Sequence, residues 1–165
     1  MSEPARKLGD APIRAVRLGP QDVTVERRAD GTLILRSPEL LGPYPDKITE
    51  RLDHWAKVAP DRVFMAERGA DDAWRTVTYA QARHEARAIG AALLTRNLSA
   101  ERPIAILSGH SIDHALLALA ALYVGIPHAP ISPAYSLVSG DFARLRAIVE
   151  FITPCLVFAS DGQAF

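Results

Sequence analysis

Two side chains that can do chemistry, those of His110 and Ser111, follow Gly109 where a short apolar run ends and an apolar helix is expected to begin. A serine at a sharp strand-to-helix turn is the setting of a hydrolase nucleophile, G-x-S-x-G. Here the second glycine is replaced by Asp113, and no convincing acid–histidine pair follows. The alternative is helix capping by His110 or Ser111, with Asp113 favoured in the first turn by the helix dipole.

The sequence gives equally little support for a metal site or a phosphate-binding site. His110 and His114 are four residues apart, which places two imidazoles on one helix face, but the glutamate of a zincin motif is absent and His128 is the only nearby third candidate. Neither G-x-G-x-x-G nor G-x-x-x-x-G-K-[ST] occurs, and lysine stands only at positions 7, 47 and 57. Cys155 opens an apolar run and is expected to be a buried filler. We therefore assign no catalytic, cofactor-binding or metal-binding residue to this chain.

The elements around these residues predict a layered α/β body. Apolar runs at 103–107 and 127–131 flank a nearly all-apolar helix at 111–124, and Gly125 is suited to end that helix. A second helix at 142–152 leads to a third apolar run at 155–159. This β-α-β-α-β order predicts half of a doubly wound parallel sheet, with the first helix deep in the body.

The preceding residues predict hairpins and two further helices. Asp30-Gly31 joins two β-prone runs, and a second hairpin is expected at 63–77. A helix is expected from Asp46, its cap, to Val58, and another from Thr78, which forms a capping box with Gln81. The fold class is therefore α/β: N-terminal β-hairpins followed by the parallel-sheet half. Residues 1–20 are expected to form a flexible leader, and residues 21–165 one subdomain.

Composition excludes several classes of protein. The 165 residues are 48% hydrophobic and carry 19 basic and 19 acidic side chains, so there is no basic excess for nucleic acid or a membrane surface. The longest apolar stretch, about 13 residues, is too short to span a bilayer. No signal peptide pattern is present, and a single cysteine fits a reducing compartment. A soluble cytoplasmic protein is expected.

Four strings, in order, resemble the N-terminal region of the adenylate-forming acyl-CoA synthetase family. They are PDKITERLDHWAKVAPDRVFMAE (45–67), WRTVTYAQARHEARAIGAALL (74–94), ALYVGIPHAPISPAY (121–135) and the later FARLRAIVEFITPCLVFAS. The resemblance covers about residues 20–165. The strings LGPYPDKITERLDHWAKVAPDR and SPAYSLVS are most similar to feruloyl-CoA synthetases and related aryl acid–CoA ligases.

The resemblance implies a two-step ATP-dependent ligation. A carboxylate such as ferulate attacks the α-phosphate of ATP, and the thiol of CoA then displaces AMP from the acyl-adenylate; Mg²⁺ neutralises phosphate charge. The family's Pro-Lys-ended phosphate loop, its nucleotide-binding motifs and its C-terminal lysine have no counterpart in these 165 residues. No cofactor is therefore expected for this segment alone, and ATP, Mg²⁺ and CoA are expected for the parent enzyme.

Three interpretations remain open. The chain is a truncated N-terminal part of an acid–CoA ligase, a free-standing α/β binding or interaction module that kept only the scaffold, or a hydrolase using Ser111. A three-stranded parallel sheet leaves an open edge. The expected partners are therefore the remainder of the ligase chain, or a second copy meeting this one through exposed edges.

Overall fold

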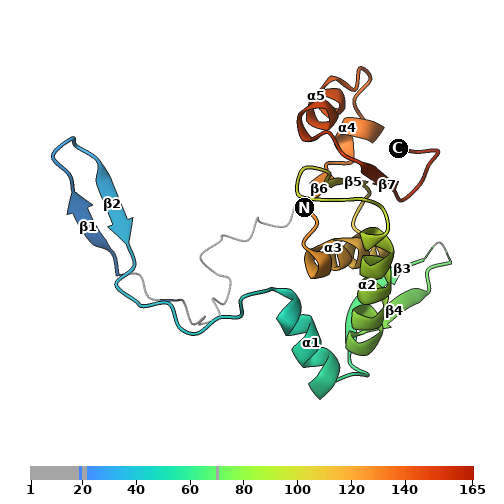
Figure 1. Ribbon diagram of the computed structural model, residues 1–165, viewed down its shortest axis with the longest axis horizontal. Coiled ribbons are helices and arrows are strands. Elements are labelled where there is room, and N and C mark those ends of the chain that lie inside the picture. The colour runs from blue at the N-terminus through green and yellow to red at the C-terminus, as the bar shows by residue number, and fades with distance from the viewer. Residues whose placement is uncertain (1–18, 20–21, 70) are drawn as a thin grey trace, which may run out of the picture. The chain divides into compact units, whose positions relative to one another are not determined.

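A computed structural model describes residue 19 and residues 22–69 and 71–165. The chain divides into two compact units, Met1–Tyr44 and Pro45–Phe165, and each is described by itself (Figure 1). Apart from Gly19, the expected leader at 1–20 lies outside the described residues. No helix in the described ranges is long and apolar enough to cross a bilayer.

The first unit holds the predicted hairpin. Strands β1 (Thr24–Arg27) and β2 (Leu33–Arg36) pair antiparallel, with Val25 opposite Leu35. Gly31 takes φ +85° at the turn, a conformation that glycine adopts without steric cost. On one face Glu26 pairs with Arg36 at 2.6 Å.

The second unit opens with helix α1 (Thr49–Val58), the hairpin of β3 (Val63–Arg68) and β4 (Trp74–Thr78), and helix α2 (Tyr79–Leu94). The predicted capping box is confirmed: Thr78 Oγ1 accepts from Gln81 N, and Gln81 Oε1 accepts from Thr78 N. The predicted cap at Asp46 is wrong. The helix starts three residues later, with Ile48 at the N-cap and no side-chain hydrogen bond there.

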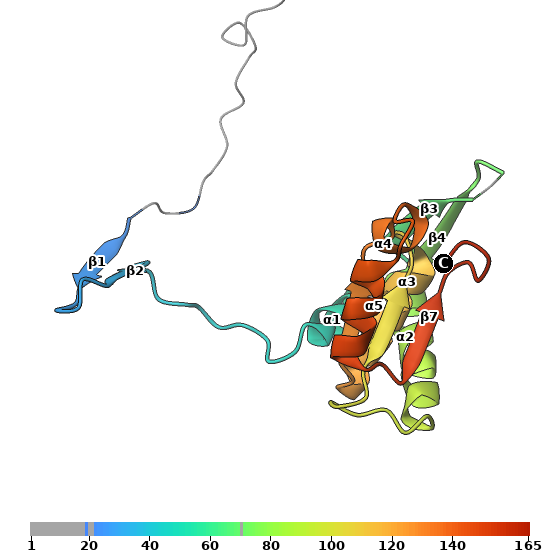
Figure 2. The ribbon, with the colours of Figure 1, turned by 90° about the horizontal axis from the view of Figure 1, so that it is seen from above.

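The predicted β-α-β-α-β half is confirmed as strand β5 (Ile104–Leu107), helix α3 (Ile112–Val124), strand β6 (His128–Ile131), helices α4 (Ala134–Leu137) and α5 (Ala143–Ile152), and strand β7 (Leu156–Ala159). The parallel sheet has the order β6-β5-β7, so β5 is central. Helices α2 and α3 lie on one side of the sheet and α5 lies on the other (Figure 2). Helix α4 was not predicted, because 132–139 reads as a turn.

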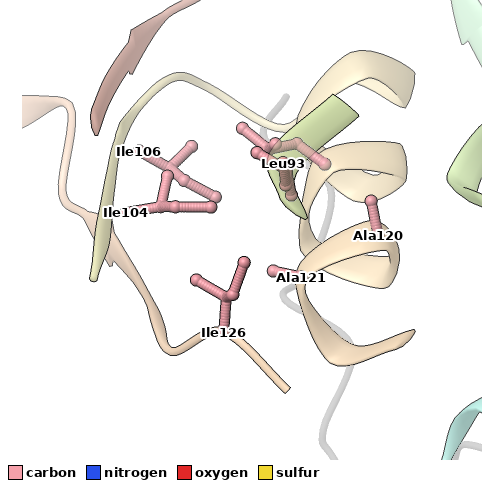
Figure 3. Packing of buried hydrophobic residues seen from close by; sticks show 7 residues of the cluster. Leu93, Ile104, Ile106, Ala120, Ala121 and Ile126 are labelled. Atoms are coloured by element: carbon pink, nitrogen blue, oxygen red, sulfur yellow. The ribbon is translucent and has the colours of Figure 1, made fainter. Parts of the chain in front are cut away.

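The core of this unit forms where β5 meets α2 and α3. Ile104 and Ile106 are fully buried and point toward Ala120 and Ala121 of α3 and Leu93 of α2 (Figure 3). The small alanine side chains let the helix approach the strand closely. The two helices are also close to each other: a Cβ on Gly90 of α2 would lie 3.1 Å from Val124 Cγ1.

Helix α3 is enclosed on several sides and keeps an exposed strip on the outside. Its inward residues are buried, and Gly125 ends it with φ +70° as expected. Asp113 is exposed, Ala118 is only half-buried, and Leu122 is 43% exposed. The expectation of a helix covered on several sides is confirmed, because the sheet, α2, and α1 with the β3–β4 hairpin all pack on α3, although an outer strip stays uncovered in the described unit.

Candidate functional site

The topology creates one crevice at the carboxyl ends of β5 and β6. After β5 the chain turns to α3 on one side of the sheet, and after β6 it turns to α4 and α5 on the other (Figure 2). Ligands of open α/β sheets bind at such a switch point, because the two loops diverge there and leave a hollow. The hollow measures about 370 Å³ and is lined by Ser108, Gly109, His110, His114 and residues 130–133.

Hydrogen bonds fix the first loop of this crevice. The buried Ser108 donates its hydroxyl to Gly109 O at 2.9 Å, and its Oγ lies 3.4 Å from Ser111 Oγ. His114 Nδ1 lies 3.1 Å from Gly109 O. Because a carbonyl oxygen only accepts, Nδ1 must carry the proton. A neutral His114 therefore presents Nε2 as an acceptor.

Ser111 is held as a helix cap. Its Oγ accepts from His114 N at 3.1 Å, and its backbone is extended as an N-cap residue requires. The capping interpretation is thus confirmed for Ser111, while His110 is exposed. The His114 ring bonds Gly109 O, so within the described residues no imidazole is arranged as a base for Ser111. The geometry gives the hydrolase alternative no support.

The histidines do not form a metal centre in the described part of the chain, where no group of three metal-ligating side chains comes together. His110 is exposed, and His114 is half-buried in the loop network. His128 is also half-buried; burial, and then the nearby charge of His114, lowers its pKa. A lowered pKa keeps His128 neutral near pH 7 at the start of β6.

A glutamate from a distant hairpin positions the first loop, and sequence reasoning missed it. Glu67 Oε2 accepts from Ile112 N at 2.7 Å, at the first turn of α3. Arg75 bridges the hairpin and α3: its NH1 lies 2.9 Å from Glu67 Oε1, and its NH2 lies 2.8 Å from Asp113 Oδ1. The carboxylate meets the positive end of the helix dipole there. Since Glu67 and Ile112 are 45 residues apart, no local pattern signals the contact.

A stack of aromatic rings begins at Phe64 on that hairpin, beside a second hollow. This hollow of about 380 Å³ shares His110 with the crevice and reaches Ser111 at the start of α3 and Phe64 on β3. The Phe64 ring stacks on Tyr79 at 4.7 Å between centroids, and Tyr79 stacks on Trp55 at 5.9 Å. This ladder ties α1, β3 and α2 together.

Cys155 contradicts its prediction. It is exposed, and it precedes β7 instead of lying within the strand. Its N–H donates to Pro103 O at 3.0 Å, so the backbone is tied to β5 while the side chain stays outside the core.

The crevice does not fit the triphosphate of ATP with Mg²⁺. No lysine or arginine lines the crevice, and Lys47 and Lys57 are the only lysines in the described ranges. Triphosphate recognition needs cationic donors, and Mg²⁺ needs convergent oxygens. The crevice offers imidazole, hydroxyl and apolar groups, which suit an uncharged or apolar part of a ligand.

The sequence matches a known protein family over most of its length. Residues 52–164 match the family described as AMP-binding enzyme. No curated protein matches the chain.

Solved structures with the same fold include three that cover much of the chain. IdnL1 is 23% identical over 73% of this chain and 23% of its own, with a TM-score of 0.61. CmiS6 is 26% identical over 75% and 31%, with a TM-score of 0.60. The fatty acid AMP ligase from Legionella pneumophila is 20% identical over 67% and 19%, with a TM-score of 0.59. The chain thus spans less than a third of the length of each of these proteins.

Proposed function

Because the chain belongs to the AMP-binding enzyme family, we propose that it forms the N-terminal α/β segment of an adenylate-forming ligase that joins a carboxylic acid to CoA. The match over residues 52–164 carries this proposal. It includes α2, the parallel sheet and the crevice at the ends of β5 and β6.

The reaction class is supported by a neighbour of the same fold. The fatty acyl-adenylate ligase from L. pneumophila was solved with acyl adenylate and pyrophosphate, and matches this chain with a TM-score of 0.58. The chain's resemblance to aryl acid–CoA ligases favours ferulate or a related aromatic acid as the substrate. We place the reaction in the cytoplasm, because the single cysteine fits a reducing compartment.

In this proposal the 165 residues form a structural scaffold for the rest of the ligase. The crevice loop is held by Ser108, Ser111, His114 and the distant Glu67, which together give a fixed wall on which other parts of a ligase can be mounted. The phosphate-binding and adenylating groups would come from other segments, since no lysine or arginine lines the crevice.

A pyrophosphate-release assay tests the proposal on two matched proteins. One is this chain, and the other is the product of the full reading frame that encodes it, each supplied with ATP, Mg²⁺, ferulate and CoA. We expect pyrophosphate release, and feruloyl thioester, from the full product and none above background from the 165 residues. Turnover by the 165 residues would overturn their role as scaffold.

A reading frame confined to these residues, or one lacking a Gly-rich loop followed by Pro-Lys, would favour the second candidate instead. That candidate is a non-catalytic interaction module with the ligase scaffold. The crevice without cationic groups is the observation that favours it.

A further inference from the structure

A cluster of charged side chains surrounds a third hollow, formed between α1, α2 and the end of α3. This hollow measures about 410 Å³ and shares no residue with the crevice. Lys47, just before α1, and Arg87 on α2 lie in its walls. A neighbouring hollow shares Asp53 with it and is lined by Lys57 and Arg83. Both lysines of the described ranges therefore lie around one place, in a chain with no net charge.

The carboxylate of Asp53 does not neutralise the cations of the third hollow. Its Oδ1 already accepts from Arg83 Nε at 2.6 Å and from the Tyr123 hydroxyl at 3.0 Å. Among the described residues, neither Lys47 nor Arg87 forms an ion pair. Two cationic side chains in this hollow are therefore left to meet a ligand.

Thr49 adds a hydroxyl to the same hollow. It is the first residue of α1 and is only 4% exposed, and its side chain forms no hydrogen bond with another described residue. This hydroxyl is therefore available to a ligand atom in the hollow. The start of a helix also favours an anion, because it carries partial positive charge. The N–H groups of Glu50 and Arg51 bond Lys47 O and Ile48 O, so the donors left for a ligand are side chains.

We propose that the third hollow binds the phosphate group of a small organic phosphate, held by Lys47, Arg87 and Thr49. An arginine fork, a lysine and a hydroxyl together match the several outer oxygens of a phosphate. Three apolar side chains also line the hollow: Ala91, Leu94 and Val124. They suit a small apolar group attached to the phosphate. The inference is independent of the proposed ligase activity.

The charges of the third hollow favour a dissolved ligand over a protein segment packed permanently in it. Lys47, Glu50 and Arg87 are exposed, and none forms an ion pair with another described residue. A packed segment would take these charges out of water, which carries a large desolvation cost for each unpaired ion. A small anion pairs with the two cations and leaves their outer sides hydrated. Glu50 opposes the anion, so its charge should limit the affinity.

NMR spectroscopy of the ¹⁵N-labelled 165-residue chain, titrated with phenyl phosphate at constant ionic strength, tests the proposal. We expect saturable shifts of amides around Thr49 and Arg87, and weaker binding of inorganic phosphate. Arg87→Gln should weaken phenyl phosphate binding about tenfold, because a charge-assisted hydrogen bond is lost. Glu50→Gln should tighten binding, because it removes the opposing charge. Arg51→Gln is the matched control, since Arg51 is exposed on α1 and does not line the hollow, and it should bind like the unmodified chain.

Three results would overturn the proposal. They are shifts that do not saturate, an Arg51→Gln variant that loses as much affinity as Arg87→Gln, and phenyl phosphate that binds no tighter than inorganic phosphate. If Arg87→Gln does not fold, Lys47→Gln takes its place, because Lys47 precedes the helix.

The same titration on the product of the full reading frame separates this inference from the proposed function. It needs no turnover, so its outcome does not depend on whether that product is a ligase. Binding should persist there. Loss of binding would show that another segment of the protein covers the third hollow, and would refute the site.

Discussion

Replacing Glu67 with alanine should lower the free energy of unfolding of the second unit by about 2 kcal/mol. The Glu67 side chain is 25% exposed, and it accepts a 2.7 Å hydrogen bond from Ile112 N at the start of α3. A hydrogen bond to a charged group contributes about 1.5–3 kcal/mol. A carboxylate at a helix N-terminus adds about 0.3–1 kcal/mol. The Arg75 side chain is about half exposed, so its ion pair with Glu67 adds little to the free energy of unfolding. In Glu67→Ala, water that reaches the freed Ile112 N–H offsets part of the lost stability.

Urea denaturation followed by tryptophan fluorescence measures this effect, because Trp55 and Trp74 both belong to the second unit. Glu67→Gln keeps an acceptor oxygen and loses only the charge, so it should cost about half as much as Glu67→Ala. Glu150→Ala, on the exposed surface of α5, is the control and should stay within about 0.5 kcal/mol of the unmodified chain. If Glu67→Ala and Glu150→Ala cannot be distinguished, the long-range cap does not support α3 as argued.

Three further outcomes follow from the same contacts. Ile106 is fully buried in β5, so Ile106→Ala removes buried carbon and leaves a cavity. In urea denaturation it should lower the free energy of unfolding by about 3 kcal/mol. A decrease below about 1 kcal/mol would mean that the core around β5 is loosely packed. Burial raises the pKa of Asp53, but hydrogen bonds from Arg83 and Tyr123 outweigh it and hold that pKa below its ordinary value. The stabilisation is therefore present above about pH 4 and lost as pH falls through the lowered pKa, and Asp53→Asn should flatten the acid limb of stability against pH. Burial and the Asp53 carboxylate raise the pKa of Tyr123 to about 12, so the stability that this tyrosine contributes should fall as pH rises between about 10 and 12. Ultraviolet titration should show a tyrosine that ionises late, and the absence of such a late step would contradict the Asp53 contact.

Local sequence signals predicted most of the elements, and their failures have physical causes. The capping box at Thr78, the serine cap of α3 and the glycine after it were predicted correctly, because each depends on residues within one turn of the helix. Asp46 failed as a cap because the first turn of α1 forms three residues further on. Cys155 failed because apolar periodicity does not say where pairing with β5 begins, and the strand starts one residue later.

The crevice depended on topology. The sequence places Ser108–Ser111 after one strand and Ser132 after the next, but the order β6-β5-β7 decides that these two loops lie at the same switch point. Without that order, His110, His114 and Ser132 are scattered polar residues. The missing lysines, by contrast, were evident from composition alone.

The sequence by itself determined the α/β class, the parallel-sheet half and the resemblance that the family match supports, because periodicity, caps and short strings are local properties of the chain. Only the tertiary structure decided that Glu67 caps a helix 45 residues away, that Asp53 joins Arg83 and Tyr123 across three helices, and that β5 lies between β6 and β7 in the sheet. Such contacts depend on how elements pack. Residues distant along the chain meet only after the sheet order and the helix positions are set.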